Sequence, residues 1–130
     1  MKTDPVIRLV VLDIDGVVSQ GEAQPLDLGL LALLAERVDL VYSTACLNVL
    51  PRGIDKGKGL EFLSRTTQIP FETILAVGDS DVDLPFLRLA AVSAAPRNAN
   101  HGVRHWVDTV SPHADAQGVR YILGHFGLRP

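Results

Sequence analysis

A single stretch governs the architecture of this chain: Leu9-Val10-Val11-Leu12-Asp13-Ile14-Asp15-Gly16-Val17-Val18. Its apolar first half is typical of a strand that is buried on both faces of a parallel sheet. Because alternate strand residues point the same way, Asp13 and Asp15 share a direction if the strand continues through them. Two carboxylates at the mouth of an apolar strand are costly unless a cation or a proton neutralises them. The pattern indicates a cation site, and a strand ending in a solvated acidic turn is the alternative.

A second apolar run, at 74–77, also leads into acidic residues, in Gly78-Asp79-Ser80-Asp81-Val82-Asp83. Strands that alternate with helices predict a parallel sheet with right-handed crossovers. Ligands of such sheets bind at the carboxyl ends of the strands, which is where both acidic segments fall. We therefore expect an α/β fold that brings the two segments together.

Each further segment is read from its periodicity and from its Gly and Pro residues. We expect helices at 26–38, 60–69, 84–89, 98–106 and 117–126, with a flexible basic loop at 56–59 and Asn98 as a helix cap. We expect strands at 38–44, 46–50, 74–77, 91–94 and 107–110.

The acidic residues Asp13, Asp15, Asp79 and Asp83 would meet at one edge of this sheet. Four carboxylates this close repel one another strongly, and a hard divalent cation such as Mg²⁺ is their natural partner. Two lysines, Lys56 and Lys58, lie between the acidic segments. A metal, a lysine and a free carboxylate together indicate a site that transfers a phosphoryl group. An aspartate can attack phosphorus and give an aspartyl-phosphate, which water then hydrolyses.

The order of these residues resembles the haloacid dehalogenase superfamily. Asp13-Ile14-Asp15-Gly16 is similar to its first motif, Lys56-Gly57 followed by Leu60 to its third, and Gly78-Asp79-Ser80-x-x-Asp83 to its fourth. The segments 93–99 and 118–119 resemble the tail of the branch that contains small-molecule and sugar-phosphate phosphatases. That branch carries an α/β cap between the second and third motifs. The resemblance implies a three-layer Rossmann-like core with a mainly parallel sheet.

By position, the resemblance implies a role for each matching residue. Asp13 would be the nucleophile, and Asp15 the general acid that later activates water. The Asp13 carboxylate, the Asp15 backbone carbonyl and Asp79 would hold Mg²⁺. Asp83 would complete and orient that shell, and Lys56 would offset charge on the phosphoryl oxygens. The expected substrate is a small phosphorylated metabolite.

The second motif, a strand ending in Thr or Ser, has two interpretations here. If 38–44 is the second core strand, Thr44 supplies the hydroxyl that binds the phosphoryl group. Alternatively, 38–55 is the remnant of a cap joined to the core near Arg37-Val38, and most of the cap is absent. We favour the remnant, in which Thr44 does not bind phosphate. Without a cap, a monomer is expected to be slow and unselective unless a neighbouring chain covers the site. Val82 also replaces the Asn that is common in this branch.

Composition sets the remaining bounds. A length of 130 residues suits one domain, here 1–130, and the formal charge of −3 gives no reason to expect nucleic acid or an anionic membrane as a partner. No apolar run reaches the length of a membrane span, no separate signal region is evident, and the single cysteine, Cys46, fits a reducing compartment. We expect a cytoplasmic protein.

Three functions compete. A Mg²⁺-dependent phosphomonoester phosphatase acting through Asp13 is the first, and a catalytically impaired core that binds Mg²⁺ or a partner is the second. A phosphoacceptor receiver domain is disfavoured, because receivers place their lysine after the phosphorylated aspartate and Lys56 precedes Asp79. His101 and His105 are four residues apart on an expected helix, and we interpret them as surface residues because no third metal ligand is evident.

Overall fold

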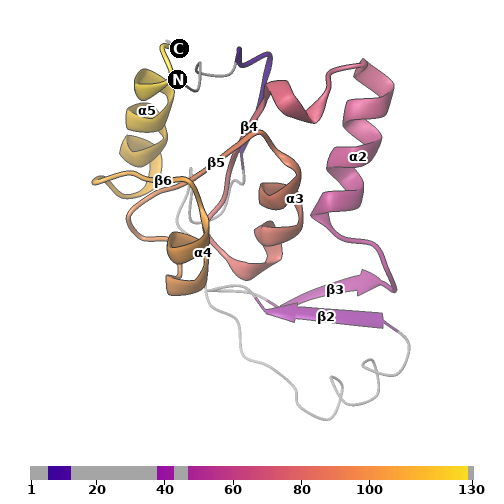
Figure 1. Cartoon of the computed structure of the whole chain (residues 1–130). Coiled ribbons are helices and arrows are strands. Elements are labelled where there is room, and N and C mark those ends of the chain that lie inside the picture. The colour runs from indigo at the N-terminus through magenta and orange to yellow at the C-terminus, as the bar shows by residue number, and fades with distance from the viewer. Residues whose placement is uncertain (1–5, 13–37, 43–46, 129–130) are drawn as a thin grey trace.

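The structure is a computed structural model that describes residues 6–12, 38–42 and 47–128. Its larger sheet contains four strands in the order β1-β4-β5-β6 (Figure 1). Every neighbouring pair in it is parallel, which confirms the predicted α/β class. The bounds of these strands are β1 Leu9–Leu12, β4 Ile74–Val77, β5 Val92–Ala95 and β6 Thr109–Val110.

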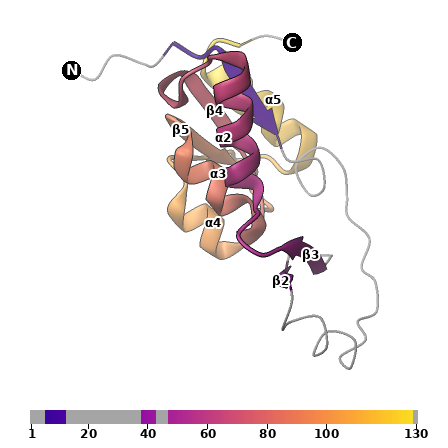
Figure 2. The same ribbon diagram turned by 90° about the vertical axis from the view of Figure 1, so that its right-hand side faces the viewer.

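Helices cover both faces of this sheet and give three layers (Figures 1 and 2). All four residues of β4 are fully buried, so neither face of the strand meets water. The helices among the described residues are α2 Lys56–Thr67, α3 Leu84–Leu89, α4 His101–Trp106 and α5 Asp115–His125, and the short 3-10 helices are η1 Phe71–Thr73 and η2 Asp81–Asp83. On one face, Ile74 and Ala76 pack in a cluster with side chains of α2, α3 and α4. On the other, Leu75 and Val77 pack with side chains of α5.

The predicted basic loop at 56–59 is wrong, because α2 already begins at Lys56. Asp55 caps the helix, and its Oδ1 accepts a hydrogen bond from the Lys58 amide at 2.9 Å. Gly57 allows α2 to approach α3 closely, since a Cβ there would lie 3.0 Å from the Pro85 Cβ and carbonyl oxygen. The cap and this close packing outweigh the low helix propensity of the glycines.

The predicted cap of α4 is also wrong, because the helix is capped by Asn100 rather than by Asn98. The Asn100 Oδ1 accepts from the Val103 amide at 2.9 Å. Asn98 instead pairs with Asp115 at the start of α5, where its Nδ2 donates to Oδ1 at 2.9 Å and its Oδ1 accepts from the Asp115 amide at 3.0 Å. Two Asn side chains therefore hold the loop after β5, since Asn98 ties its middle to α5 and Asn100 ties its end to α4.

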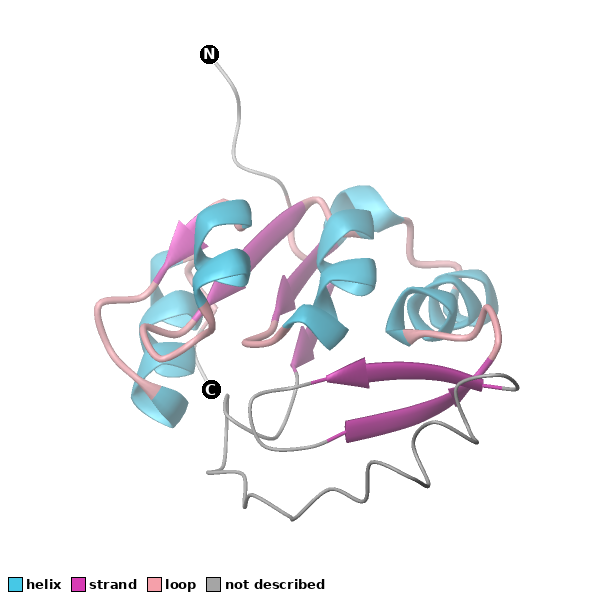
Figure 3. Ribbon diagram, turned by 90° about the horizontal axis from the view of Figure 1, so that it is seen from below, coloured by secondary structure: helices cyan, strands magenta, loops and turns pink. Residues whose placement is uncertain are grey.

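The segment predicted as 38–44 does not join the larger sheet. Strand β2 (Val38–Tyr42) pairs in antiparallel fashion with β3 (Leu47–Pro51) in a separate two-stranded sheet (Figure 3). Strand β2 contacts η2, so this hairpin lies at the carboxyl edge of the larger sheet (Figure 1). The interpretation of 38–44 as a second core strand is therefore wrong. Thr44 lies outside the described residues, and its role stays a prediction without the strand placement that motivated it.

Two further predictions concern residues that the structure does not describe. Residues 26–37 of the expected helix and the cysteine at position 46 fall outside the described residues, and Val38, where the helix was expected to end, is the first residue of β2. Within the described segments, no helix is long and apolar enough to cross a bilayer.

Candidate active site

Strands β1 and β4 end at the same edge of the sheet, and the loop after β4 builds the candidate site. Leu12, the last residue of β1, is level with Val77, the last of β4. The loop from Gly78 then places Asp79 at this edge with only 5% of its surface exposed. Asp13 is the next residue in the sequence after Leu12. Asp13 and Asp15 lie outside the described residues, so their roles stay predictions.

Asp83 holds this loop in shape from within. It is completely buried, and its Oδ2 accepts hydrogen bonds from the backbone amides of Asp79 and Ser80 at 2.9 and 3.1 Å. The carboxyl group sits directly over Gly78, where a Cβ would lie 2.6 Å from the Asp83 Cβ and 2.9 Å from its Cγ. The glycine is required because any side chain at position 78 would fill the space of this carboxyl group.

Lys56 reaches the other oxygen of this carboxylate from the first turn of α2. Its Nζ lies 2.5 Å from Asp83 Oδ1, and 5.9 Å from the centre of the Phe86 ring. The Lys56 side chain remains 38% exposed, whereas that of Asp83 is inaccessible. The ammonium group is therefore held at the edge of the loop that carries Asp79, with one side open to solvent.

The two predicted lysines differ in what they contact. Lys58 Nζ lies 3.3 Å from Glu61 Oε2 on the outer face of α2, with 57% of its side chain exposed. Lys56 is thus the lysine that contacts the acidic loop. Of the six predicted site residues, the structure brings together Lys56, Asp79 and Asp83, and it does not describe Asp13, Asp15 and Thr44.

Asn100 is a residue of this region that the sequence did not single out. Its backbone amide donates to the Asp79 carbonyl at 2.8 Å, and its Nδ2 donates to Asp81 Oδ1 at 3.1 Å. With its cap on α4, Asn100 joins the loop after β4 to the loop after β5. The available signal was the second Asn in Asn98-Ala99-Asn100, directly before the helix.

A cavity of about 360 Å³ separates the hairpin from the loop that carries the acidic residues. Asp39 and Leu50 of the hairpin line one side, and Asp81, Val82 and Pro85 line the other. Within the described ranges, no three His, Cys, Asp or Glu side chains form a group that could hold a metal. His101 and His105 are exposed and stack on one another with 6.1 Å between ring centres, as expected of surface residues.

Known proteins resemble this chain over most of its length. A family model described as haloacid dehalogenase-like hydrolase matches residues 32–123, a segment that begins after Asp13 and Asp15. A phosphoglycolate phosphatase of Methanothrix thermoacetophila is 35% identical over 88 residues, which are 68% of this chain and 40% of the relative. A phosphoglycolate phosphatase of Thermoplasma volcanium is 33% identical over 96 residues, covering 72% of this chain and 43% of the relative.

Solved structures also resemble this chain. A HAD subclass IIB sugar phosphatase superposes with a TM-score of 0.61 at 26% identity, covering 71% of this chain and 36% of that protein. The chain spans about two fifths of the length of the curated relatives given above. Because the family model matches well over half of the residues, and because the matched segment includes Lys56, Asp79 and Asp83, the chain belongs to the haloacid dehalogenase-like hydrolase family.

Proposed function

We propose that the chain is a Mg²⁺-dependent phosphatase that hydrolyses a small phosphomonoester, such as a sugar phosphate, through an aspartyl-phosphate on Asp13. One observation carries the proposal. Asp83 contacts both the ammonium of Lys56 and the backbone amide of Asp79, and the loop that contains Asp79 directly follows β4, the strand that pairs with β1. This arrangement supplies a fixed positive charge and a buried carboxylate at the edge where the chain continues into Asp13.

The steps of hydrolysis divide between Asp13 and Asp15. The Asp13 carboxylate attacks phosphorus and the ester oxygen departs, protonated by the Asp15 carboxyl group. The Asp15 carboxylate then takes a proton from water, which attacks phosphorus and releases phosphate with the Asp13 carboxylate restored. Lys56 stabilises the negative charge on the phosphoryl oxygens, and its contact with Asp83 orients it in advance.

The donor set fits Mg²⁺, which prefers oxygen ligands and usually retains several waters. Asp79 offers a buried carboxylate, and we propose the Asp13 carboxylate and the Asp15 carbonyl as its companions. Asp83 was a predicted ligand, but its oxygens already accept from Lys56 and from two backbone amides, which supports an orienting role. When bound, Mg²⁺ would neutralise charge on the carboxylates and on the phosphate group.

The named relatives support a small phosphorylated metabolite as the substrate. Two of them are phosphoglycolate phosphatases and a structural neighbour is a sugar phosphatase. We further propose that 38–55 is what remains of a cap, since the hairpin lies outside the larger sheet and contacts η2. The cavity between the hairpin and the acidic loop then offers space for part of the substrate.

A second candidate is a core that binds Mg²⁺ or a partner without efficient turnover. It is favoured by the position of β1, which is the terminal strand of the larger sheet among the described residues. A second core strand beside β1 would carry the hydroxyl that binds the phosphoryl group, and 38–42 does not take that place. In this second candidate the metal binds, but the phosphoryl group is not held for attack.

Release of phosphate from p-nitrophenyl phosphate separates the two candidates. If the chain is a phosphatase, phosphate release should depend on Mg²⁺, and it should be lost when a chelator is added and in Asp13→Asn. Equal rates for the unchanged protein and Asp13→Asn would exclude the phosphatase. The second candidate predicts no release above the buffer rate, while calorimetry still detects Mg²⁺ binding that Asp79→Asn abolishes.

A further inference from the structure

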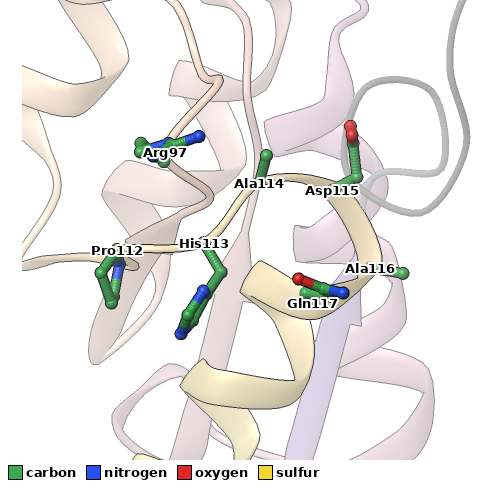
Figure 4. A pocket seen from close by; sticks show the side chains of 7 residues that line it. All are labelled: Arg97, Pro112, His113, Ala114, Asp115, Ala116 and Gln117. Carbon is green, nitrogen blue, oxygen red and sulfur yellow. The ribbon is translucent and has the colours of Figure 1, made fainter.

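A second cavity, which we call the edge pocket, lies at the same edge of the sheet. It has a volume of about 380 Å³, and its polar side chains are Arg97, His113, Asp115 and Gln117. Figure 4 shows that Arg97 comes from the loop after β5, His113 from the chain leading into α5, and Asp115 and Gln117 from the first turn of α5. None of these residues has a role in the hydrolytic steps above.

The edge pocket adjoins the candidate active site. The Gly78 amide donates to the Ala94 carbonyl at 3.2 Å, so the ends of β4 and β5 lie side by side. Neighbouring strands lie about 4.8 Å apart. Arg97 follows β5 by two residues, as Asp79 follows β4. A group bound near Asp79 is thus one strand away from the loop that carries Arg97.

The loops of the edge pocket are fixed in place by hydrogen bonds. The Arg97 amide donates to the His113 carbonyl at 2.9 Å, which ties the loop after β5 to the chain before α5. The two hydrogen bonds between Asn98 and Asp115 join the same loop to the start of α5 at a second point. The His113 ring packs edge-on against Tyr121 with 5.7 Å between ring centres. The backbone of Arg97 is therefore held in place by these hydrogen bonds, while the residue is exposed to solvent.

The guanidinium of Arg97 has no ion pair or hydrogen bond within the segments that the structure describes. Asp115, the acidic residue among those that line the edge pocket, already accepts a hydrogen bond from Asn98. An exposed guanidinium at the rim of a cavity is suited to bind a planar carboxylate through two parallel hydrogen bonds. A second phosphate group would bring more negative charge towards Asp115 than a carboxylate does, so the lining suits an anion of single charge better.

We propose that the edge pocket binds the carboxylate of a phosphorylated hydroxy acid and that Arg97 determines this specificity. The inference rests on the proposed phosphatase function and extends it to a substrate class. The phosphoryl group occupies the site near Asp79 and Lys56, and the carboxylate of the same molecule reaches Arg97. Phosphomonoesters without an acidic group leave Arg97 without a partner and are the poorer substrates.

Two matched compounds test the specificity. 3-Phosphoglycerate and glycerol 3-phosphate differ only in a carboxylate that replaces a hydroxymethyl group. The unchanged protein should favour 3-phosphoglycerate in kcat/KM, and Arg97→Gln should reduce this preference about tenfold, as expected for one charge-assisted contact. Arg120→Gln removes the same charge from an exposed position on α5 and should leave the preference unchanged. A preference that is absent, or that survives Arg97→Gln, would overturn the inference.

A binding measurement without turnover separates failure of the inference from failure of the proposed function. Glycerate, with glycerol as the uncharged control, is titrated into the full chain and followed by the amide NMR signals of Arg97, His113 and Asp115. These signals should move with glycerate in the unchanged protein and in Arg120→Gln, but not in Arg97→Gln. If neither phosphate ester is hydrolysed and glycerate still binds in this way, the proposed phosphatase function is excluded and the carboxylate site is supported. If glycerate does not bind, or binds equally to Arg97→Gln, the carboxylate site is excluded.

Discussion

Lys56 and Asp83 are 27 residues apart in the sequence, and their charged groups lie 2.5 Å apart in the structure. The contact joins the first turn of α2 to the end of η2, and the other Asp83 oxygen holds the amides of the loop that carries Asp79. This one carboxylate therefore fixes the position of a cation and the shape of an acidic loop together. Substitutions on either side of the contact should affect both stability and activity.

Lys56→Met tests the lysine, with Lys58→Met as its matched control in the same helical turn. Removing the Lys56 ammonium leaves the buried Asp83 carboxylate without its cation, and the free energy of unfolding should fall by about 3 kcal/mol. Lys58 makes only an exposed contact with Glu61, so Lys58→Met should change stability by less than about 0.5 kcal/mol. Urea denaturation measures both. Equal losses in the two variants would contradict a special role for the contact between Lys56 and Asp83.

Gly78→Ala tests the close approach of Asp83 to the backbone. The added Cβ would lie 2.6 Å from the Asp83 Cβ, so the loop must shift, at a cost of about 2 kcal/mol. Phosphate release should fall as well, because Asp79 belongs to the same loop.

Gly59→Ala is the control for this substitution. Position 59 is in α2, and a Cβ there meets nothing within 4 Å. The free energy of unfolding should rise by about 1 kcal/mol, because alanine favours the helix. If thermal unfolding shows Gly78→Ala to be as stable as Gly59→Ala, the described loop conformation is wrong.

Asn100→Asp tests the link between the loops after β4 and β5. Aspartate still caps α4, but its carboxylate replaces the donor that bonds to Asp81 and faces a like charge. We expect a loss of about 1 kcal/mol at neutral pH. Adding Asp81→Asn restores a donor opposite position 100 and should recover most of this loss. A double variant no more stable than Asn100→Asp would show that the hydrogen bond between positions 100 and 81 does not contribute to the free energy of unfolding.

The sequence predicted β4 well because the signal there is local. Four apolar residues bounded by a glycine describe a strand buried on both faces, and the structure buries all four. The parallel direction of the larger sheet also followed, from the alternation of strands and helices along the chain. These features depend on composition, period and the order of the segments, which the sequence carries without any knowledge of contacts.

The errors lie where contacts between distant segments decide the local structure. Nothing near Asn98 shows that it bonds to Asp115 while Asn100 caps α4, since either Asn is a suitable cap by itself. Likewise, Gly57 looks like a loop residue until Pro85 of α3 packs against it. The placement of 38–42 depended on whether this segment was the second core strand or part of the remnant of a cap, and the sequence alone left both interpretations open.

The central claim is that one cation binds where the ends of β1 and β4 meet. Mn²⁺ in place of Mg²⁺ broadens the NMR signals of nearby amides, so its position can be read from the spectrum. We predict the strongest broadening at Leu12 and at Gly78 and Asp79 together, with weaker effects at Leu9 and Ile74, and loss of the pattern in Asp79→Asn. Broadening that is centred elsewhere, or that affects only one of the two strands, would contradict the account.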